Sequence, residues 1–184
     1  MNREQYKQML SKDRENSVNL GNYPSLKNRL TCEHKYLLWK YILLLRKDEY
    51  YSSKKHPFSF FIKRKRYLLG AKLGIHIPNG TCGGGLVLWH YGSVIINGNA
   101  RIGNDCQFHG NNCVGNKGVI NEGAPIIGNN VDVGFGAVVI GPIRIADNVV
   151  IGANAVVTKD CLVEGAILVG APAKIVGNIA DKHR

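Results

Sequence analysis

A six-residue rhythm of aliphatic side chains runs through the second half of this chain and restricts its fold more than any other feature. An α-helix repeats every 3.6 residues and a single amphipathic strand every 2, so neither explains the pattern. A smaller apolar residue usually follows four positions after each aliphatic one. Such a rhythm is typical of a parallel β-helix of hexapeptide repeats, in which three repeats make one triangular coil. The aliphatic positions are Ile127, Val133, Val139, Ile145, Ile151, Val157, Val163, Val169 and Ile175.

The rhythm also reads backwards from Ile127, through Val114, Phe108, Ile102 and Ile96, to position 90, which is a histidine. It is interrupted at residues 116–126. A segment that leaves a repeat and returns to it has to bulge outward as a loop, and such loops tend to carry function. We therefore expect a little over four coils, a core of aliphatic columns and one excursion loop.

The positive charge lies entirely in the first part of the chain. Residues 1–72 contain 17 Lys and Arg against 6 Asp and Glu, whereas residues 73–184 contain 7 of each class. Glycine is distributed the other way, with 21 of 22 from Gly70 onward. Two segments with different physics therefore meet near residue 70. The expected units are a basic α-helical segment at 1–70, a β-helix domain at 71–177 with its loop at 116–126, and a tail at 178–184.

The N-terminal segment contains one pattern that has to be covered by other parts of the protein. Residues 2–15 favour a polar helix. A second helix is expected from an N-cap at Thr31 to a last turn at Arg46 and Lys47. Its residues 36–45 are apolar nearly all round, so the β-helix or another subunit should cover it.

The basic stretch at 54–69 has two interpretations. It is either a helix that packs Phe, Ile and Leu inward and solvates its charges, or a patch for an anionic partner such as a membrane surface, a lipid-linked phosphate or an acidic polysaccharide. Nucleic acid is not expected, because no nucleic-acid-reading motif accompanies the charge.

The cysteines and the apolar runs indicate a cytoplasmic protein. The five cysteines form no CxxC pair and no Cys/His ligand spacing, so we expect reduced thiols and no metal. The N-terminus is polar and resembles no signal peptide. The longest apolar run, 36–45, is too short to span a bilayer. Peripheral association with the inner face of the membrane remains the alternative.

Three stretches resemble a known family: LWHYGSVII at 88–96, IGANAVVTKD at 151–160 and VGAPAKIVG at 169–177. In this order and spacing they resemble the left-handed β-helix acyltransferases of the serine acetyltransferase-like branch, and most of all the capsular and exopolysaccharide O-acetyltransferases. The resemblance alone implies the left hand, since the crossover rule for parallel strands predicts a right-handed coil.

The resemblance further implies acetyl-CoA as the donor, a homotrimer or a dimer of such trimers, and active sites in clefts between adjacent prisms. His90 matches the catalytic histidine of the family. A hydroxyl attacks a thioester only when its proton is removed, and imidazole has a suitable pKa for that role. The other interpretation is that His90 fills a corner of the repeat where an aliphatic residue should sit.

Three residues near His90 are candidates for acceptor binding. Trp89 and Tyr91 flank it, and an aromatic ring beside the base suits the face of a sugar. His109 follows His90 by one coil of three hexads and one further position, so the two histidines are expected to share a cleft wall. His109 is an acceptor-binding residue, a second candidate for the base, or a solvated turn residue.

The donor-binding residues are also implied by the resemblance. Phe135 and Ala153 are separated by one full coil of three hexads and should stack on successive coils beside the pantetheine arm. Lysines would meet the phosphate charges of the donor. The other three candidates are Thr158, Lys159 and Lys174. The alternative is that Thr158 and Lys159 form an ordinary polar turn and that Lys174 is an exposed lysine at the end of the coil.

The chain departs from serine acetyltransferases wherever that family recognises its acceptor. Trp89 replaces an aspartate before the histidine, 123–125 (Gly-Ala-Pro) replaces Arg-His-Pro, and Gly74 or Ile75 stands where an aspartate pairs with the base. These losses favour a saccharide hydroxyl in capsule or exopolysaccharide biosynthesis. The alternatives are serine O-acetylation and a non-enzymatic scaffold. A zinc hydratase lacks its His-x4-His pair here, and an acyl-enzyme on Cys113 or Cys82 lacks a signal for a lowered pKa.

Overall fold

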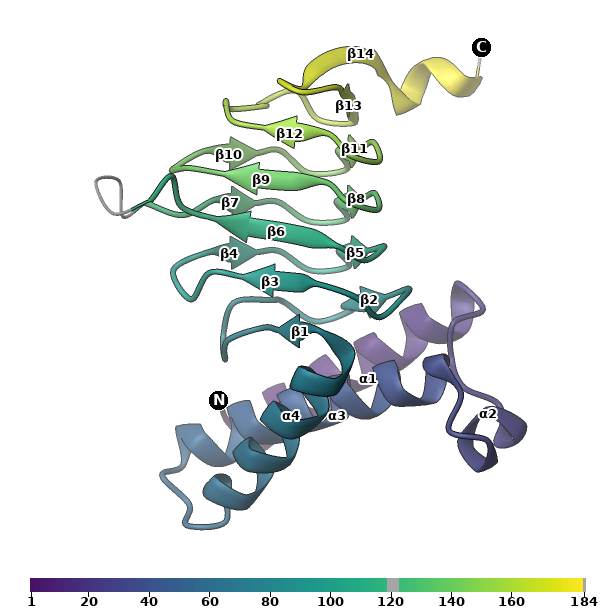
Figure 1. The fold of residues 1–184 in the computed structure, drawn as a ribbon, viewed down its shortest axis with the longest axis vertical. Helices are drawn as coiled ribbons and strands as arrows, with labels where there is room; N and C mark the ends of the chain where they lie inside the picture. Colours follow the sequence, from purple (N-terminus) through teal and green to yellow (C-terminus); the bar gives the residue numbers. More distant parts are fainter. Residues whose placement is uncertain (119–122, 184) are drawn as a thin grey trace.

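The computed structural model describes residues 1–118 and 123–183 and divides them between a layer of helices and a three-sided stack of short strands. The helices lie at one end of the stack and the C-terminus lies at the other (Figure 1). Of the predicted excursion loop, residues 119–122 lie outside the described part. The helices are α1 (Arg3–Asn19), α2 (Leu26–Leu30), α3 (His34–Ser53), α4 (Ser59–Leu73) and a terminal 3-10 helix η1 (Ile179–His183).

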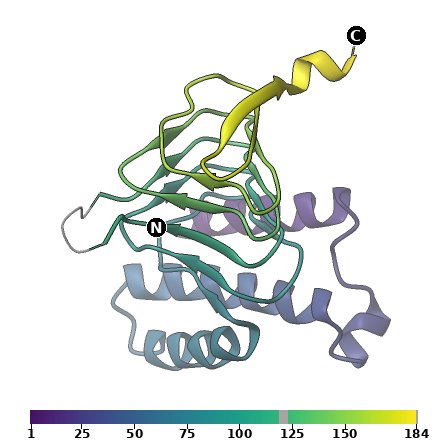
Figure 2. The same ribbon diagram turned by 45° about the horizontal axis from the view of Figure 1, so that its top comes forward.

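Each side of the stack is a sheet whose neighbouring strands come from successive coils, and the coils appear as stacked triangles in Figure 2. Sheet A contains β1 (Ile75–His76), β3 (Val94–Ile96), β6 (Asn112–Gly115), β9 (Val138–Ile140) and β12 (Val156–Val157). Sheet B contains β4 (Arg101–Ile102), β7 (Ile126–Ile127) and β10 (Arg144–Ile145). Sheet C contains β2 (Val87–Leu88), β5 (Gln107–Phe108), β8 (Asp132–Val133), β11 (Val150–Ile151), β13 (Ala166–Val169) and β14 (Lys174–Asn178).

The strands pair in parallel except for β13 and β14, which are antiparallel. The coil is left-handed, as the resemblance implied. The crossover rule, which predicts the opposite hand, therefore fails for this chain. The fold is the left-handed parallel β-helix with a helical N-terminal segment that the sequence predicted.

The predicted aliphatic columns fill the middle of the stack. Ile127, Val133, Val139, Ile145, Ile151 and Val157 are all buried. Burial of each such side chain contributes about 1.5–3 kcal/mol. At the C-terminal end the prediction is wrong, because Val163, Val169 and Ile175 are 39–50% exposed. Ile151 pairs with Leu168 rather than with Val169, so this coil is one position shorter than three hexads and the six-residue count loses register there.

The register also differs from the prediction at the first coil. Leu88 pairs with Phe108, so this coil is two positions longer than three hexads, and both side chains are fully buried. Leu88 therefore fills the corner that the rhythm assigned to position 90. His90 lies just beyond the core column, and its side chain is exposed.

A buried ion pair fastens the helices to the first coil. Arg46 of α3 donates to Asp13 of α1 at 2.8 Å, and both side chains are fully buried. The same guanidinium donates to the carbonyl oxygens of Cys82 and Gly83 at 3.0 and 2.5 Å. The Asp13 carboxylate in turn accepts hydrogen bonds from backbone amides of the first coil. A second buried pair joins α3 to α4, from Asp48 to Arg66 at 3.0 Å.

The sequence placed α3 correctly but not its ends. Its N-cap is Glu33 rather than Thr31, which instead ends α2. The helix continues beyond Lys47 to Ser53, so Arg46 lies in its interior rather than in its last turn. The apolar residues of α3 are covered mainly by α1, α2 and α4 rather than by the β-helix or another subunit, so the expected source of cover is wrong. Within the described residues, no helix is both long enough and apolar enough to cross a membrane.

Candidate active site

His90 stands at the head of a column of residues on the corner where sheet C turns toward sheet A. On successive coils of sheet C, Leu88 pairs with Phe108, Phe108 with Val133, and Val133 with Ile151. The residue two positions after each of these lies at this corner. Backbone hydrogen bonds follow this column, from the Gly136 amide to the Gly110 carbonyl and from the Asn154 amide to the Phe135 carbonyl. The four corner residues are His90, Gly110, Phe135 and Ala153.

Gly110 holds the middle of this column open. Its φ is +113°, and a Cβ atom there would lie 3.3 Å from the Phe135 ring and 3.5 Å from the Cβ of His90. His90 and Phe135 therefore face one residue from opposite sides. Phe135 is 45% exposed and Ala153 is exposed, so the column presents an apolar edge to solvent beside the imidazole.

The His90 ring has free nitrogen atoms in the part of the chain that the structure describes, because no hydrogen bond joins it to another described residue. Its neighbour is His34, whose ring is stacked on it with centroids 6.0 Å apart. Tyr91, 58% exposed, lies edge-on to the same His34 ring at 6.5 Å. An exposed imidazole with an open nitrogen is suited to take a proton from a hydroxyl that approaches from solvent.

His34 is a site residue that the sequence did not reveal. It is the first residue of α3, and nothing in the residues around it distinguishes it from a surface histidine. Its Nδ1 lies 3.8 Å from a carboxylate oxygen of Glu33, which is close enough for an attraction between charges but too long for a hydrogen bond. The fold alone brings this histidine to His90, since the whole of α3 and α4 separates the two in the sequence.

Trp89 belongs to a second cluster on the outer face of sheet C. Its ring is stacked on His109 with centroids 5.6 Å apart, and its Nε1 donates to the Gln107 side chain at 2.9 Å. His109 Nε2 lies 2.8 Å from Asp132 Oδ1. Because the first coil is longer than three hexads, His109 aligns with Trp89 and not with His90, so the expected spacing of one coil and one position is wrong.

Asp132 is the second residue that the sequence did not single out. Its side chain is 38% exposed and supplies a carboxylate to this cluster. The only signal was its outward position in a strand whose next residue, Val133, is buried. The Trp89 cluster therefore has both a flat aromatic surface and a negative charge.

The remaining donor-site candidates lie on the last coil, at the end of the stack away from the helices (Figure 1). Thr158 follows β12 and is partly buried, while Lys159 is exposed. The backbone oxygen of Thr158 accepts from Lys117 Nζ at 3.3 Å, which ties it to the start of the excursion loop. Lys174 begins β14 and is exposed. The amide of Ala173 donates to Val156, so β14 starts beside β12.

The buried thiols do not favour the alternative of an acyl-enzyme. Burial raises the pKa of Cys82 to about 12 and that of Cys106 to about 11, and a thiol rather than a thiolate is a poor nucleophile. Cys113 is partly buried. Among the described residues, no group of three or more His, Cys, Asp or Glu side chains is arranged to hold a metal ion.

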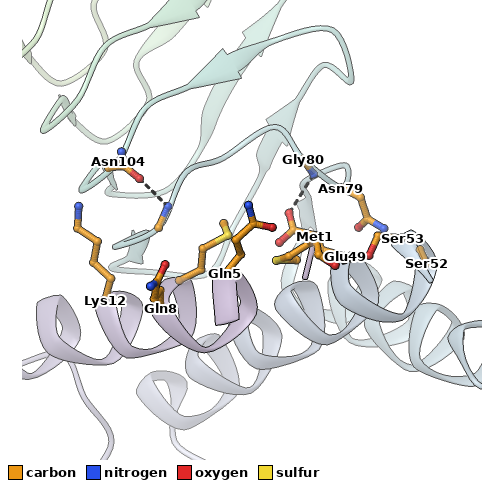
Figure 3. A pocket seen from close by; sticks show the side chains of 12 residues that line it. Met1, Gln5, Gln8, Lys12, Glu49, Ser52, Ser53, Asn79, Gly80 and Asn104 are labelled. Atoms are coloured by element: carbon orange, nitrogen blue, oxygen red, sulfur yellow. Dashed lines mark hydrogen bonds between the residues drawn. The ribbon is translucent and has the colours of Figure 1, made fainter. Parts of the chain in front are cut away.

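A cavity of about 720 Å³ lies elsewhere, between α1, α3 and the first coil (Figure 3). Its two charged side chains, Lys12 and Glu49, are already engaged. Lys12 pairs with Asp105 at 2.7 Å, and Glu49 accepts from the Gly80 amide at 2.9 Å. It contains none of the residues that the sequence predicted for the site. We therefore place the candidate active site at the His90 corner.

Comparison with solved structures finds serine acetyltransferases. The enzyme of Neisseria gonorrhoeae in complex with serine matches with a TM-score of 0.73 and 22% identity over 95% of this chain and 70% of that one. The Brucella abortus strain S19 enzyme in complex with coenzyme A gives 0.73 and 20% over 96% and 69%. The soybean apoenzyme gives 0.71 and 20% over 94% and 69%. At this identity the likeness establishes the fold. Neither a protein-family model nor a curated protein sequence matches the chain.

Proposed function

We propose that this protein is an acetyl-CoA-dependent O-acetyltransferase and that His90 is its general base. The observation that carries the proposal is the position of the His90 ring. It is exposed, outside the core column, and in line with Phe135 and Ala153 on successive coils. A neighbour with the same fold is a serine acetyltransferase in complex with coenzyme A, which supports acetyl-CoA as the donor.

The reaction would proceed by direct transfer. An imidazole nitrogen of His90 accepts the proton of the acceptor hydroxyl while the hydroxyl oxygen attacks the thioester carbonyl. The tetrahedral intermediate then expels the thiolate of coenzyme A, which receives that proton from His90. The donor arm would run along the exposed edge formed by Phe135 and Ala153, where Gly110 leaves room. Lys159 and Lys174 would meet the phosphates of the nucleotide, with Thr158 beside them.

His34 would act as a positioning residue. Its ring, stacked on that of His90 at 6.0 Å between centroids, limits how the His90 imidazole can turn. The amino-acid pattern alone indicated no residue that orients the base, and we assign this role to His34.

L-serine is the first acceptor to test. The comparisons favour it over the saccharide that the sequence suggested, since one neighbour was solved with serine and another with cysteine. Asp132 offers a carboxylate for the amino group of such a substrate. A saccharide hydroxyl remains the second candidate, because Trp89 and Tyr91 present aromatic surfaces near the base.

The test measures release of coenzyme A from acetyl-CoA with L-serine and with a panel of sugars. His90→Ala should lower turnover about 10²- to 10⁴-fold with little change in acetyl-CoA affinity. His76→Ala is the matched control, since it removes an exposed histidine of the first coil away from the corner. A loss of less than about tenfold would exclude His90 as the base and make His109 the next candidate. Absence of acetyl-CoA binding would favour the non-enzymatic scaffold.

We further propose that the functional unit is a homotrimer, with each site completed between neighbouring prisms. Exposed apolar side chains at the C-terminal end of the stack are consistent with such contacts, because single chains rarely leave so many uncovered in one region. These side chains are Leu162, Val163, Val169, Ile175 and Val176. The mass measured by light scattering distinguishes a trimer from two trimers that pair through the helical segment.

A further inference from the structure

The positive charge of the helical segment is concentrated where no acidic residue balances it. The sequence has no Asp or Glu from residue 50 to residue 104. Between 54 and 72 it has seven Lys and Arg, of which one, Arg66, is buried and paired with Asp48. The other six are exposed: Lys54, Lys55, Lys63, Arg64, Lys65 and Lys72.

The outer face of α4 is apolar as well as basic. The buried face of the helix carries Ile62, Arg66, Gly70 and Leu73, spaced three and four positions apart, and packs toward α3 and β1. A helix on the surface of a globular protein usually has polar residues on its opposite face. Here that face carries large rings and an aliphatic side chain, each about half exposed or more. They are Phe60 (65%), Phe61 (58%), Tyr67 (48%) and Leu68 (54%).

A groove continues this face between α1, α3 and α4. It has a volume of about 650 Å³ and contains four cationic side chains among aromatic ones. None of its lining residues is acidic, and none of the four cations is paired with a described carboxylate. Burial raises the pKa of Tyr6, which keeps that phenol protonated as a hydrogen-bond donor. The cations are Arg3, Lys7, Lys47 and Lys65, and the rings are Tyr6, Tyr50, Tyr51, Phe58 and Phe61.

This combination of chemistry selects one kind of occupant. Cations and phenols bind phosphate oxygens, and exposed Phe and Leu side chains gain free energy by entering the boundary between headgroups and acyl chains. A second copy of the same face would instead bring six unpaired cations against six others. The α3–α4 connection also lies at the end of the molecule farthest from β14, where a flat surface can reach it without meeting the stack (Figure 1).

We propose that the outer face of α4 and the adjoining groove form a binding surface for an anionic phospholipid bilayer, with lipid phosphates in the groove and Phe60 and Phe61 in the interface. The inference does not rest on the acetyl transfer proposed above. Binding through this surface would hold the stack of coils upright on the membrane and leave the His90 corner in solution.

The experiment is cosedimentation of the full-length protein with vesicles of phosphatidylcholine alone and with vesicles that also contain phosphatidylglycerol. Lys47→Gln/Lys65→Gln should lower the partition coefficient on anionic vesicles about 25-fold, at about fivefold for each charge near such a surface. Phe60→Ser/Phe61→Ser should lower it about tenfold for each ring. Lys27→Gln/Arg29→Gln is the control for charge. It removes two cations from α2, at the opposite end of the helical layer (Figure 1), and should have a much smaller effect.

Equal binding to both kinds of vesicle, no binding, or equal losses in all three variants would each overturn the proposal. Light scattering without lipid tests the competing occupant, which is a second copy of this chain. If Phe60→Ser/Phe61→Ser reduces the number of subunits, the face is a contact between copies and the proposal is wrong. Binding to soluble polyphosphate without vesicle binding would likewise assign the surface to a polyanion and overturn it. Thermal melts of the variants show whether each has folded.

Discussion

Replacing Asp13 with alanine tests how the helical layer is held to the stack. The carboxylate accepts four hydrogen bonds and has no contact with solvent. Oδ2 accepts from Arg46 Nε at 2.8 Å, and Oδ1 accepts from Arg46 Nη2 at 3.2 Å. Oδ1 also accepts from the amides of Gly85 and Leu86 at 2.7 and 2.9 Å. One side chain of α1 thus joins α3 and the first coil at a single point.

The magnitude follows from what the substitution leaves behind. Removing one partner of a buried ion pair typically costs about 3–5 kcal/mol, because the other charge stays buried. Arg46 keeps Glu49 at 3.0 Å and two carbonyl oxygens, which reduces the loss. Two buried amides lose their acceptor, which adds to it. We expect the free energy of unfolding to fall by about 4 kcal/mol, a large share of the roughly 5–15 kcal/mol of an ordinary domain.

The assay is urea denaturation at one fixed protein concentration, because association shifts apparent stability. Glu15→Ala is the matched control, since it removes an exposed carboxylate from the same helix and should change the free energy by no more than about 0.5 kcal/mol. Asp13→Asn, which keeps one acceptor oxygen, should fall between the two. A loss below about 1 kcal/mol for Asp13→Ala would refute the reasoning, because a surface pair behaves that way and a buried one does not.

Two further predictions concern the thiols and the assembly. Iodoacetamide should alkylate the exposed Cys32 in the native protein and leave Cys82 and Cys106 unmodified until it unfolds, as mass spectrometry of the labelled peptides would show. Because the pKa of the Cys82 thiol is 9.0 when unfolded and rises to about 12 on burial, the free energy of unfolding should fall as the pH rises through that interval. Rapid labelling of native Cys82 would contradict both statements. Light scattering should give three times the 20.2 kDa chain mass, and a monomer would exclude sites between subunits.

The middle of the fold follows from the sequence because the interior of a β-helix repeats the same problem at each coil. At every sixth position one side chain enters a space of the same size, so Ile127 to Val157 could be assigned without coordinates. At the two ends the coils contact α4 or the antiparallel β14 instead of another coil of the same kind, and the six-residue count loses register there. The first coil is longer than three hexads and the last is shorter. Leu88 thereby takes the core position that the six-residue count assigned to position 90, and Val163 leaves the core.

The polar contacts were harder to predict for a different reason. Hydrogen bonds and stacking in the site join residues from separate elements, and no periodicity connects them. His34 meets His90 only because α3 begins beside the first coil, and Asp132 meets His109 only because the second coil includes the excursion loop. The buried carboxylates Asp13 and Asp48 look like ordinary helix-surface residues in the sequence.

The reversal of direction at β14 limits the length of the stack. A pile of parallel coils has no intrinsic last layer, since each rung offers its backbone to another of the same kind, as growing fibres do. Here α4 covers the opening rung at β1, while β14 runs antiparallel along β13 and takes the hydrogen-bonding edge that sheet C would otherwise offer to a following parallel coil. One side of the prism therefore ends on a strand of the opposite direction, which does not continue the parallel stack into a second molecule.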